Sequence, residues 1–298
     1  MAIAVQTNTQ WTGYPYINLQ EYKNAPTAID IDNLVVGGNA AAQDAELQAV
    51  INRASSWIDV HLNQTLVARN IQETKRTRIT PQGNITIHPD NGPFISLNAL
   101  SWGPTPNTIT AVTDPSQAWL EPTQFIYPIM QTGLTYSSQG PLSFGFPPNT
   151  GSQIYVSYNY TSGYANSGCT GTAGQTQVTV DKALGIYPGL EATIYDGSRT
   201  ENVVVASTYV YGSTTVPLTS ALQYSHTDGP SGAVISSLPD AIKQAAILVT
   251  TDFLKVRGDN SLTMAVTTRA SSGPSVQSII GSDLALAKIL LQPFRRVY

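Results

Sequence analysis

Residues 237–258 read SLPDAIKQAAILVTTDFLKVRG and carry the clearest helix pattern in the chain. Ser237 stands where an N-cap belongs, Pro239 and Asp240 fall in the first turn, and Gly258 is suited to close the far end. Between them, apolar residues recur at helical spacing and form a single stripe. Such a stripe has to be buried, so this helix needs a packing partner elsewhere in the chain.

The partner that we predict is a second long helix, over residues 40–63. Its apolar residues follow the same spacing, Asp44 and Glu46 lie near its N-terminal end, and Trp57 flanks the stripe. The two helices are expected to pack into a small helical core, with everything between them inserted or added to it. The residues expected at this contact are Leu47, Ile51, Ile58, Ile242, Ala246, Val249 and Phe253.

Between the two long helices the periodicity changes from helical to alternating. From about residue 66 to residue 160 polar and apolar residues alternate, and Pro, Asn and Gly mark turns. The clearest example is the series Ile154, Val156, Tyr158 and Tyr160, which falls on one face of a strand. This pattern predicts an antiparallel sheet.

Residues 165–235 are set off by Gly- and Ser-rich segments and contain four short strand patterns. Asp196-Gly197 between two of these runs is a hairpin signal. We expect an inserted small β-barrel or sandwich here. The predicted fold class is therefore α+β. The first domain holds an N-terminal arm, a core helix and the antiparallel β region over residues 1–164, and a core helix over 236–258 completes it after the inserted β domain. An extended C-terminal docking arm follows over 259–298.

Both ends of the chain carry shorter helix signals. Asn18 and Glu21 are spaced as a variant capping box for a short helix that Pro26 ends. Near the C-terminus, Ser282 is expected to cap a short helix over residues 283–291. That last helix is apolar nearly all round and has no obvious partner within the chain, so we expect it to be buried against another protein.

The composition indicates a protein with few charges. Charged residues make up only 11% of the 298, against roughly 25% in an average soluble protein, and 15 residues are tyrosines. This suits a β-rich protein whose faces meet other subunits. The net charge of −4 gives no general electrostatic reason for nucleic-acid binding. The single cysteine, Cys169, excludes an internal disulfide framework and a cysteine-rich metal site.

The N-terminal residues MAIAVQTNTQW lack the basic start and the long apolar run of a signal peptide. No apolar run approaches the roughly 18 residues of a membrane span. We therefore expect a soluble protein that is made in the cytoplasm.

No catalytic centre or cofactor site is indicated. The three histidines are His61, His88 and His226, and none stands at metal-ligand spacing from a histidine, cysteine or carboxylate. His61 is expected to pack on its helix and His226 to be solvated in a turn-rich loop. Nucleophile-elbow, P-loop and dinucleotide fingerprints are missing. We expect no enzyme, no metal and no cofactor, while a catalytic triad assembled by folding from distant residues stays open.

Two clusters of like charge have plain interpretations. Asp30 and Asp32 lie in one loop, where capping and solvation are favoured over binding a cation. Lys75, Arg76 and Arg78 form the densest internal basic run, for which a solvated strand edge is favoured over contact with phosphate.

Four stretches of the chain resemble the head–tail connector (adaptor) proteins of tailed bacteriophages. They are YINLQEYK at residues 16–23, the helix of residues 42–65 with Trp57-Ile58-Asp59, LPDAIKQAA at 238–246 followed by RGD, and AKILLQPFRR at 287–296. The resemblance covers both ends of the chain. The β region between them is similar only to the longer members of the family.

The resemblance implies a structural virion protein that forms a homo-oligomeric ring, usually twelvefold, below the portal. The ring would join the DNA-filled capsid to the tail and continue the DNA channel. Its partners would be other copies of itself, the portal protein, the next neck, stopper or tail protein, and DNA that passes without sequence specificity, with no membrane. The protein would be located in the virion neck after assembly in the host cytoplasm.

The C-terminal arm would dock on the portal, and its mixture of Arg and aromatic residues is typical of interface anchors. The docking residues implied are Leu284, Ile289, Leu290, Leu291, Phe294, Arg295, Arg296 and Tyr298. If the polar side of the 237–258 helix faces the channel, DNA would meet mild positive charge from Lys243, Lys255 and Arg257.

A second interpretation is a carbohydrate- or receptor-binding β-rich virion module, in which the inserted unit presents Tyr and Trp residues to a ligand. The two long helices argue against a pure lectin.

Overall fold

The protein combines helices with antiparallel sheets, which confirms the α+β class. The computed structural model describes residues 15–27, 29–80, 83–121, 123–129, 153–228, 232–256 and 276–295. The chain divides into two units. Unit 1 consists of Met1–Val67, Asn166–Ala183 and Pro188–Tyr298, and unit 2 of Ala68–Ala165 and Leu184–Tyr187. The β region of unit 2 is thus a body of its own, apart from the upstream helix with which the sequence grouped it.

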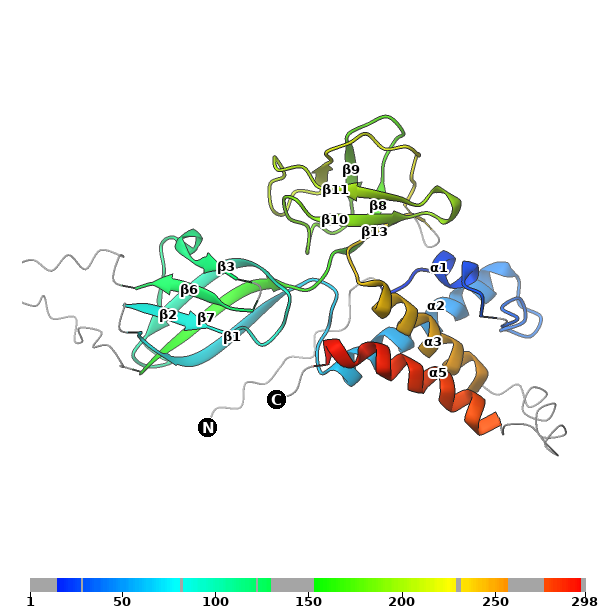
Figure 1. Cartoon of the computed structure of the whole chain (residues 1–298), viewed down its shortest axis with the longest axis horizontal. Coiled ribbons are helices and arrows are strands. Elements are labelled where there is room, and N and C mark those ends of the chain that lie inside the picture. The colour runs from blue at the N-terminus through cyan, green and yellow to red at the C-terminus, as the bar shows by residue number, and fades with distance from the viewer. Residues whose placement is uncertain are drawn as a thin grey trace, which may run out of the picture. The chain divides into compact units, whose positions relative to one another are not determined.

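The helices belong to unit 1 (Figure 1). They are α1 (Leu19–Asn24), α2 (Ala40–Leu62), α3 (Asp240–Val256) and α5 (Val276–Leu291), with a 3₁₀ turn η3 (Gln292–Phe294). The capping box before α1 is confirmed, because Asn18 accepts from the Glu21 N–H and Glu21 accepts from the Asn18 N–H. The second long helix, α2, is also confirmed; Asn39 caps its start, and Asn63 closes its end in the left-handed conformation with φ 56°.

The predicted start of α3 is wrong. The helix begins at Asp240, and the carbonyl of Pro239 accepts from the N–H groups of Ile242 and Lys243. A cap at Ser237 would require Leu238 to be helical, but a residue before proline is pushed out of the helical region. Gly258, expected to close the helix, lies outside the described residues.

The predicted helical core is confirmed. α3 packs on α2, and of the seven residues expected at the contact only Phe253 is half-buried rather than buried. Trp57 flanks the stripe and stacks on His61 with ring centroids 5.1 Å apart, so His61 packs on its helix as expected.

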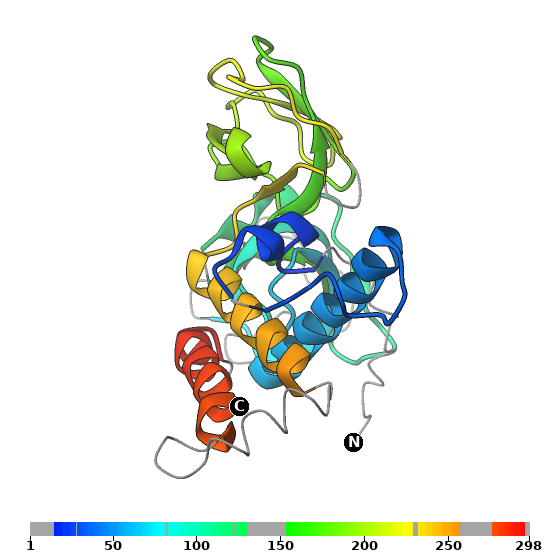
Figure 2. The same ribbon diagram turned by 90° about the vertical axis from the view of Figure 1, so that its right-hand side faces the viewer.

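The last helix differs from its prediction in length and environment. α5 begins at Val276, so Ser282 lies inside it and is not its cap. α5 runs beside α3, as both ribbon views show (Figure 2), and buries Ala287 and Leu291 completely. The apolar helix therefore has a partner within the chain, contrary to the expectation. The stretch between α3 and α5, residues 257–275, lies outside the described residues.

Unit 2 is built from two antiparallel sheets. Its strands are β1 (Arg69–Arg78), β2 (Asn84–Ile87), β3 (Phe94–Gly103), β4 (Thr110–Ala111), β5 (Trp119–Leu120), β6 (Phe125–Pro128) and β7 (Gln153–Ser162), with a 3₁₀ turn η1 (Pro115–Gln117). The sheets have the orders β1-β7-β3-β4 and β2-β6-β5. The alternation predicted for β7 is confirmed, since Ile154, Val156, Tyr158 and Tyr160 all point into the core of this unit.

The inserted domain is a small barrel. Its strands are β8 (Asn166–Thr170), β9 (Gln177–Val180), β10 (Glu191–Tyr195), β11 (Glu201–Val204), β12 (Thr215–Pro217) and β13 (Val234–Ser236), in the order β11-β10-β13-β8-β9-β12. A bridge between Val205 and Leu218 joins the two edge strands and closes the sheet. The hairpin predicted at Asp196-Gly197 is confirmed as β10–β11, joined through the 3₁₀ turn η2 (Gly197–Arg199).

Candidate functional site

The helical bundle gathers segments from both ends of the chain. The Tyr22 hydroxyl lies 3.1 Å from the Thr251 hydroxyl, which ties the α1 segment to α3. Tyr16, ahead of α1, donates from its hydroxyl to Asp59 of α2. At the far end, the Gln64 amide donates to the Phe294 carbonyl over 2.5 Å. The bundle is therefore one packed structure, not a core helix with a separate arm.

The positive face predicted on α3 is neutralised within the chain. Lys243 lies 2.7 Å from Glu21 of α1 and is mostly buried beside it. Lys255 forms an ion pair with Asp283 of α5. The third cation of the prediction, Arg257, lies outside the described residues. Because Lys243 and Lys255 each already have a carboxylate partner, this side of α3 offers little free positive charge to DNA.

The same side of α3 is concave. It lines a groove of about 500 Å³, which we call the α3 groove. The α1 segment, strand β10 and Asp283 of α5 also line it. Ile247 and Leu248 are half-buried and contribute apolar surface, while Asp240 is exposed at the start of the helix. The two described lysines of the predicted channel face thus lie at a walled groove, which has an apolar stretch between two internal ion pairs.

The implied docking residues that the structure describes differ in exposure and fall into three groups. Ile289 is 64% exposed, and its neighbour Leu286, which the sequence did not single out, is 47% exposed. Arg295 is exposed, whereas Leu284, Leu290 and Phe294 are half-buried. Leu291 is fully buried in the bundle, so it stabilises the subunit and is not available to a partner. Arg296 and Tyr298 lie outside the described residues.

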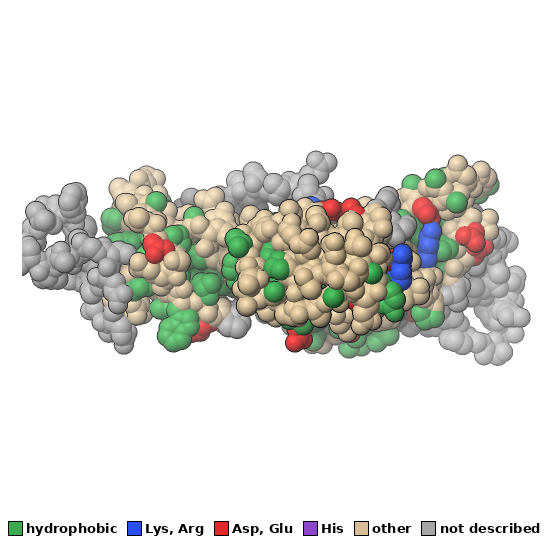
Figure 3. All heavy atoms as spheres, turned by 90° about the horizontal axis from the view of Figure 1, so that it is seen from above, with side chains coloured by type: hydrophobic (Ala, Val, Ile, Leu, Met, Phe, Trp, Pro, Cys, Tyr) green, Lys and Arg blue, Asp and Glu red, His purple; other side chains and the backbone are tan. Residues whose placement is uncertain are grey.

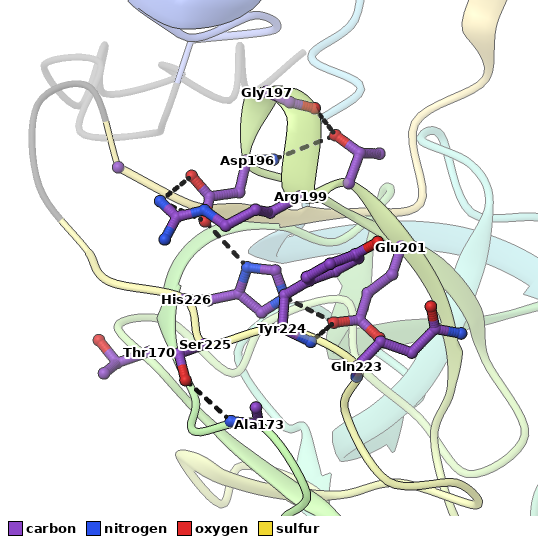
Figure 4. A network of polar contacts seen from close by, with 12 residues as sticks. Thr170, Ala173, Asp196, Gly197, Arg199, Glu201, Gln223, Tyr224, Ser225 and His226 are labelled. Atoms are coloured by element: carbon purple, nitrogen blue, oxygen red, sulfur yellow. Dashed lines mark hydrogen bonds and ion pairs between the residues drawn. The ribbon is translucent and has the colours of Figure 1, made fainter.

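His226 in the barrel is the clearest departure from the sequence prediction. It is not solvated: its ring is fully buried between two carboxylates (Figure 4). Nδ1 lies 3.0 Å from Asp196 Oδ2, and Nε2 lies 2.8 Å from Glu201 Oε1. Arg199 reaches Asp196 from outside at 3.2 Å. A ring with carboxylate oxygens at both nitrogens can donate to both only when it is doubly protonated.

Glu201 is held in its ionised form by several donors. Burial alone would raise its pKa, but the N–H of Gln223, the His226 ring and the N–H of Tyr224 outweigh burial and lower the pKa below its ordinary value of 4.5. The N–H of Gln223 lies 2.9 Å from the carboxylate and that of Tyr224 3.1 Å. The network thus joins η2, β11 and the loop before β13.

This arrangement is structural in character. Both nitrogens of His226 face carboxylates, so neither is left to activate a nucleophile.

Burial, with the nearby charges of Arg295 and Lys288, lowers the pKa of His61. Within the described ranges no group of three or more His, Cys, Asp or Glu side chains is placed to hold a metal ion. Of the helices described there, none is both long and apolar enough to cross a membrane.

The two charge clusters follow their plainer interpretations. Asp30 accepts from the Asp32 N–H at 3.0 Å and from Asn33 at 2.8 Å, so it caps its own loop. Lys75 pairs with Asp90 at 2.6 Å, and the Arg76 guanidinium lies 5.9 Å from the centre of the Tyr155 ring. Charged side chains are sparse over the face seen in Figure 3.

No protein-family model and no curated protein sequence matches the chain. Among solved structures it is similar to a chain in the neck of an empty gene transfer agent particle, at 14% identity and a TM-score of 0.37, over 95% of this chain and 94% of that one. It is also similar to a chain in the virion of a native gene transfer agent particle, at 15% identity and a TM-score of 0.32, over 93% and 92%. Likeness at this level does not establish a shared function.

Proposed function

We propose that this protein is a structural component of the neck of a tailed phage or phage-like particle. In this role it forms a homo-oligomeric ring, twelvefold in the resembling family, that docks below the portal, joins the filled capsid to the tail and continues the DNA channel. It acts by packing and docking, without catalysis or a cofactor. Its partners are its own copies, the portal protein and the next neck or tail protein.

One observation carries the proposal. The four stretches that resemble head–tail adaptors lie at opposite ends of the sequence, two before residue 66 and two after residue 237, yet the described parts of all four meet in one helical bundle. The α1 segment joins α3 through Lys243–Glu21, and the end of α2 joins the end of α5 through Gln64–Phe294. Convergence in space is what a shared structural core requires, whereas unrelated short matches would have no reason to come together.

The helical bundle also offers a surface for docking. Leu286 and Ile289 leave apolar area exposed on α5, the helix from the end of the chain that resembles a portal-docking arm. Exposed apolar side chains on an otherwise well-packed helix are the kind of anchor on which protein interfaces depend.

The test is reconstitution of the neck. Filled, tail-less capsids that lack this protein are mixed with purified chain and with tails, and joined particles are counted by electron microscopy. Unaltered protein is expected to restore joining and to appear as a ring below the portal. Ile289→Asp is expected to lower joining about tenfold or more, because a charge in an apolar contact costs at least the 1.4 kcal/mol of one decade.

Val36→Asp is the matched control, since Val36 is fully exposed in the same unit and lies away from α5 in the sequence. This variant is expected to join normally. Virions that assemble without the protein, or that carry it only on the capsid shell or tail tip, would overturn the proposal.

A second function, recognition of a receptor or carbohydrate, is favoured by one observation. The barrel exposes Tyr211 and Tyr224, and exposed aromatic rings are common in ligand-binding surfaces. Glycan-array binding by the full chain that is lost in Tyr224→Ser would support this function, and an array without signal would remove it.

A further inference from the structure

The α3 groove contains no unpaired lysine among the residues that line it. Two of its cations, Lys243 and Lys255, are already paired with Glu21 and Asp283, which also line it. Its volume of about 500 Å³ lies within the range of sites that hold a compact ligand or a few side chains. An occupant should therefore be small, partly apolar and uncharged.

The barrel carries a loop with these properties. Residues 207–213, STYVYGS, connect β11 to β12 and contain no charged side chain. At the tip of this loop Val210 is 71% exposed and Tyr211 is 56% exposed. Two adjacent exposed apolar side chains of this size form a knob, which we call the 207–213 knob.

The knob is held in shape before it meets any partner. Tyr209 is buried at its base, and its hydroxyl donates to the Ser213 carbonyl over 3.0 Å. The Ser213 N–H donates to the Val210 carbonyl over 3.1 Å, and Gly212 turns the chain at φ 84°. A pre-formed loop loses little conformational entropy on binding, which favours its use as an anchor.

We propose that the 207–213 knob of one copy of this protein inserts into the α3 groove of the next copy. Since Val210 and Tyr211 are exposed in their own subunit, they do not fill their own groove. The uncharged knob matches a groove in which both lysines are paired with carboxylates of the same chain. Tyr211 brings a hydroxyl that can donate to Asp240, the exposed carboxylate at the groove. A contact between two different surfaces of identical subunits is heterologous, and such contacts close into rings or extend into filaments.

This inference deepens the proposed ring by naming the two surfaces that join its subunits. It also separates the roles of the unit 1 elements: α5 carries the exposed apolar residues proposed for the portal, while α3 and the barrel join neighbours. The inserted barrel thereby gains a role that the resemblance to adaptors does not supply.

The decisive experiment is oxidative cross-linking of the full chain with two cysteines added, Tyr211→Cys at the knob and Gln244→Cys at the groove. The only native thiol, Cys169, is buried, and burial raises its pKa to about 12, so it should not compete. The doubly substituted protein is expected to form a ladder of dimers, trimers and larger species. Each single variant should stop at dimers, because it has only one reactive end.

A complementation experiment uses variants that each lose one surface. Val210→Ser with Tyr211→Ser removes the knob, and Ile247→Glu charges the groove. Each protein alone is expected to be monomeric by mass photometry, while their mixture forms one-to-one dimers through the surfaces that remain intact. Val36→Ser, at a fully exposed apolar residue outside the knob and the groove, is the control and should assemble as the unaltered chain does.

The inference is overturned if the 211–244 disulfide forms between chains neither in solution nor in assembled necks, or if the knob variant still builds complete rings. Rings in virions without this disulfide would leave the proposed function standing and remove only the inference. If the protein forms the cross-linked ladder in solution but is missing from virions, the inference would stand and the proposed function would be overturned.

Discussion

The barrel and unit 2 each hold a largely buried carboxylate, but they satisfy it in different ways. In unit 2, Glu73 accepts from the hydroxyls of Tyr158 at 2.6 Å and Tyr160 at 2.5 Å, which are neutral donors. In the barrel, Glu201 and Asp196 face the two nitrogens of one imidazole ring, His226, and Arg199 reaches Asp196 from outside. The first network consists mainly of hydrogen bonds from neutral donors, with Lys75 Nζ 3.8 Å from Glu73, and the second is a cluster of charged side chains around His226.

The origin of the donors also differs. Glu73 and Tyr158 are directly paired across β1 and β7, so the strand register itself brings them together. The barrel network instead spans separate turns, with His226 30 residues from Asp196 and 25 from Glu201. Removing one member of an ionic cluster leaves an unpaired buried charge, which costs more than losing a neutral hydrogen bond. Loss of one member of its network should therefore lower the stability of the barrel more than the corresponding loss lowers that of unit 2.

The largest expected effect is that of His226→Ala. This change removes the ring that lies between the carboxylates of Asp196 and Glu201, and the barrel is expected to lose about 3–5 kcal/mol of stability. Hydrogen exchange at pH 7 should show faster exchange in β8 to β13 and unchanged exchange in β1 and β7. His88→Ala is the control, since His88 is exposed in unit 2. A loss below about 1 kcal/mol would contradict the ionic description of the cluster.

The corresponding change in unit 2 is Glu73→Ala. It leaves two buried hydroxyls and the N–H of Asp90 without their acceptor, so we expect a loss of about 2–3 kcal/mol. Faster hydrogen exchange should be confined to the strands of unit 2. Thr74→Ala, on the exposed face of the same strand, should change exchange little. If Glu73→Ala were to cost more than His226→Ala, the ranking of the two units would be reversed.

The two networks should also fail at opposite ends of the pH scale. The pKa of Glu201 in the folded protein lies below 4.5, so its contribution to stability is present above pH 4.5 and is lost as the pH falls further. Burial, followed by the hydrogen bond to the Glu73 carboxylate, raises the pKa of Tyr158 and of Tyr160 above 10.0. Their contribution is present below pH 10 and is lost as the pH rises beyond it.

Methyl NMR spectra can follow the two units separately, because Ile194 lies in the barrel and Ile154 in unit 2, both buried. On acidification the Ile194 signal is expected to lose its folded position first, and in alkali the Ile154 signal should do so first. Glu201→Gln should remove the acid sensitivity attributable to this carboxyl. Simultaneous loss of both signals at each extreme would show that the networks do not set the pH limits.

The difference between the networks also explains what the sequence could predict. β7 was found from its alternation, and the α2–α3 contact from two helical stripes, because these patterns are local and repeated. Strands β8 and β13 were not expected, since NSGCT and VIS are too short to show a period. The burial of His226 depends on carboxylates from distant turns, so no local pattern marks it.

The site was predictable to a similar degree. The residues of the bundle were identified by periodicity, but the α3 groove arises only when the α1 segment, β10 and α5 come together around α3. The carboxylate partners of Lys243 and Lys255 could not be foreseen for the same reason, since Glu21 and Asp283 reach the lysines from other helices. Charges along one helix do not show which partners the fold will bring to them.

The smallest expected effects come from one exposed arginine in each unit. Arg199 pairs with the buried Asp196 of the ionic cluster, and Arg76 lies over the ring of Tyr155 on the surface of unit 2. Arg199→Ala should cost about 1 kcal/mol, the upper end for partly exposed pairs. Arg76→Ala should cost about 0.5 kcal/mol, the lower end for exposed cation–π contacts. Added salt should weaken the Arg199 effect, as far as its exposed charge is screened. Equal, salt-independent losses at both sites, measured by urea unfolding, would mean that Arg199 is not part of the ionic cluster but only packs on its surface.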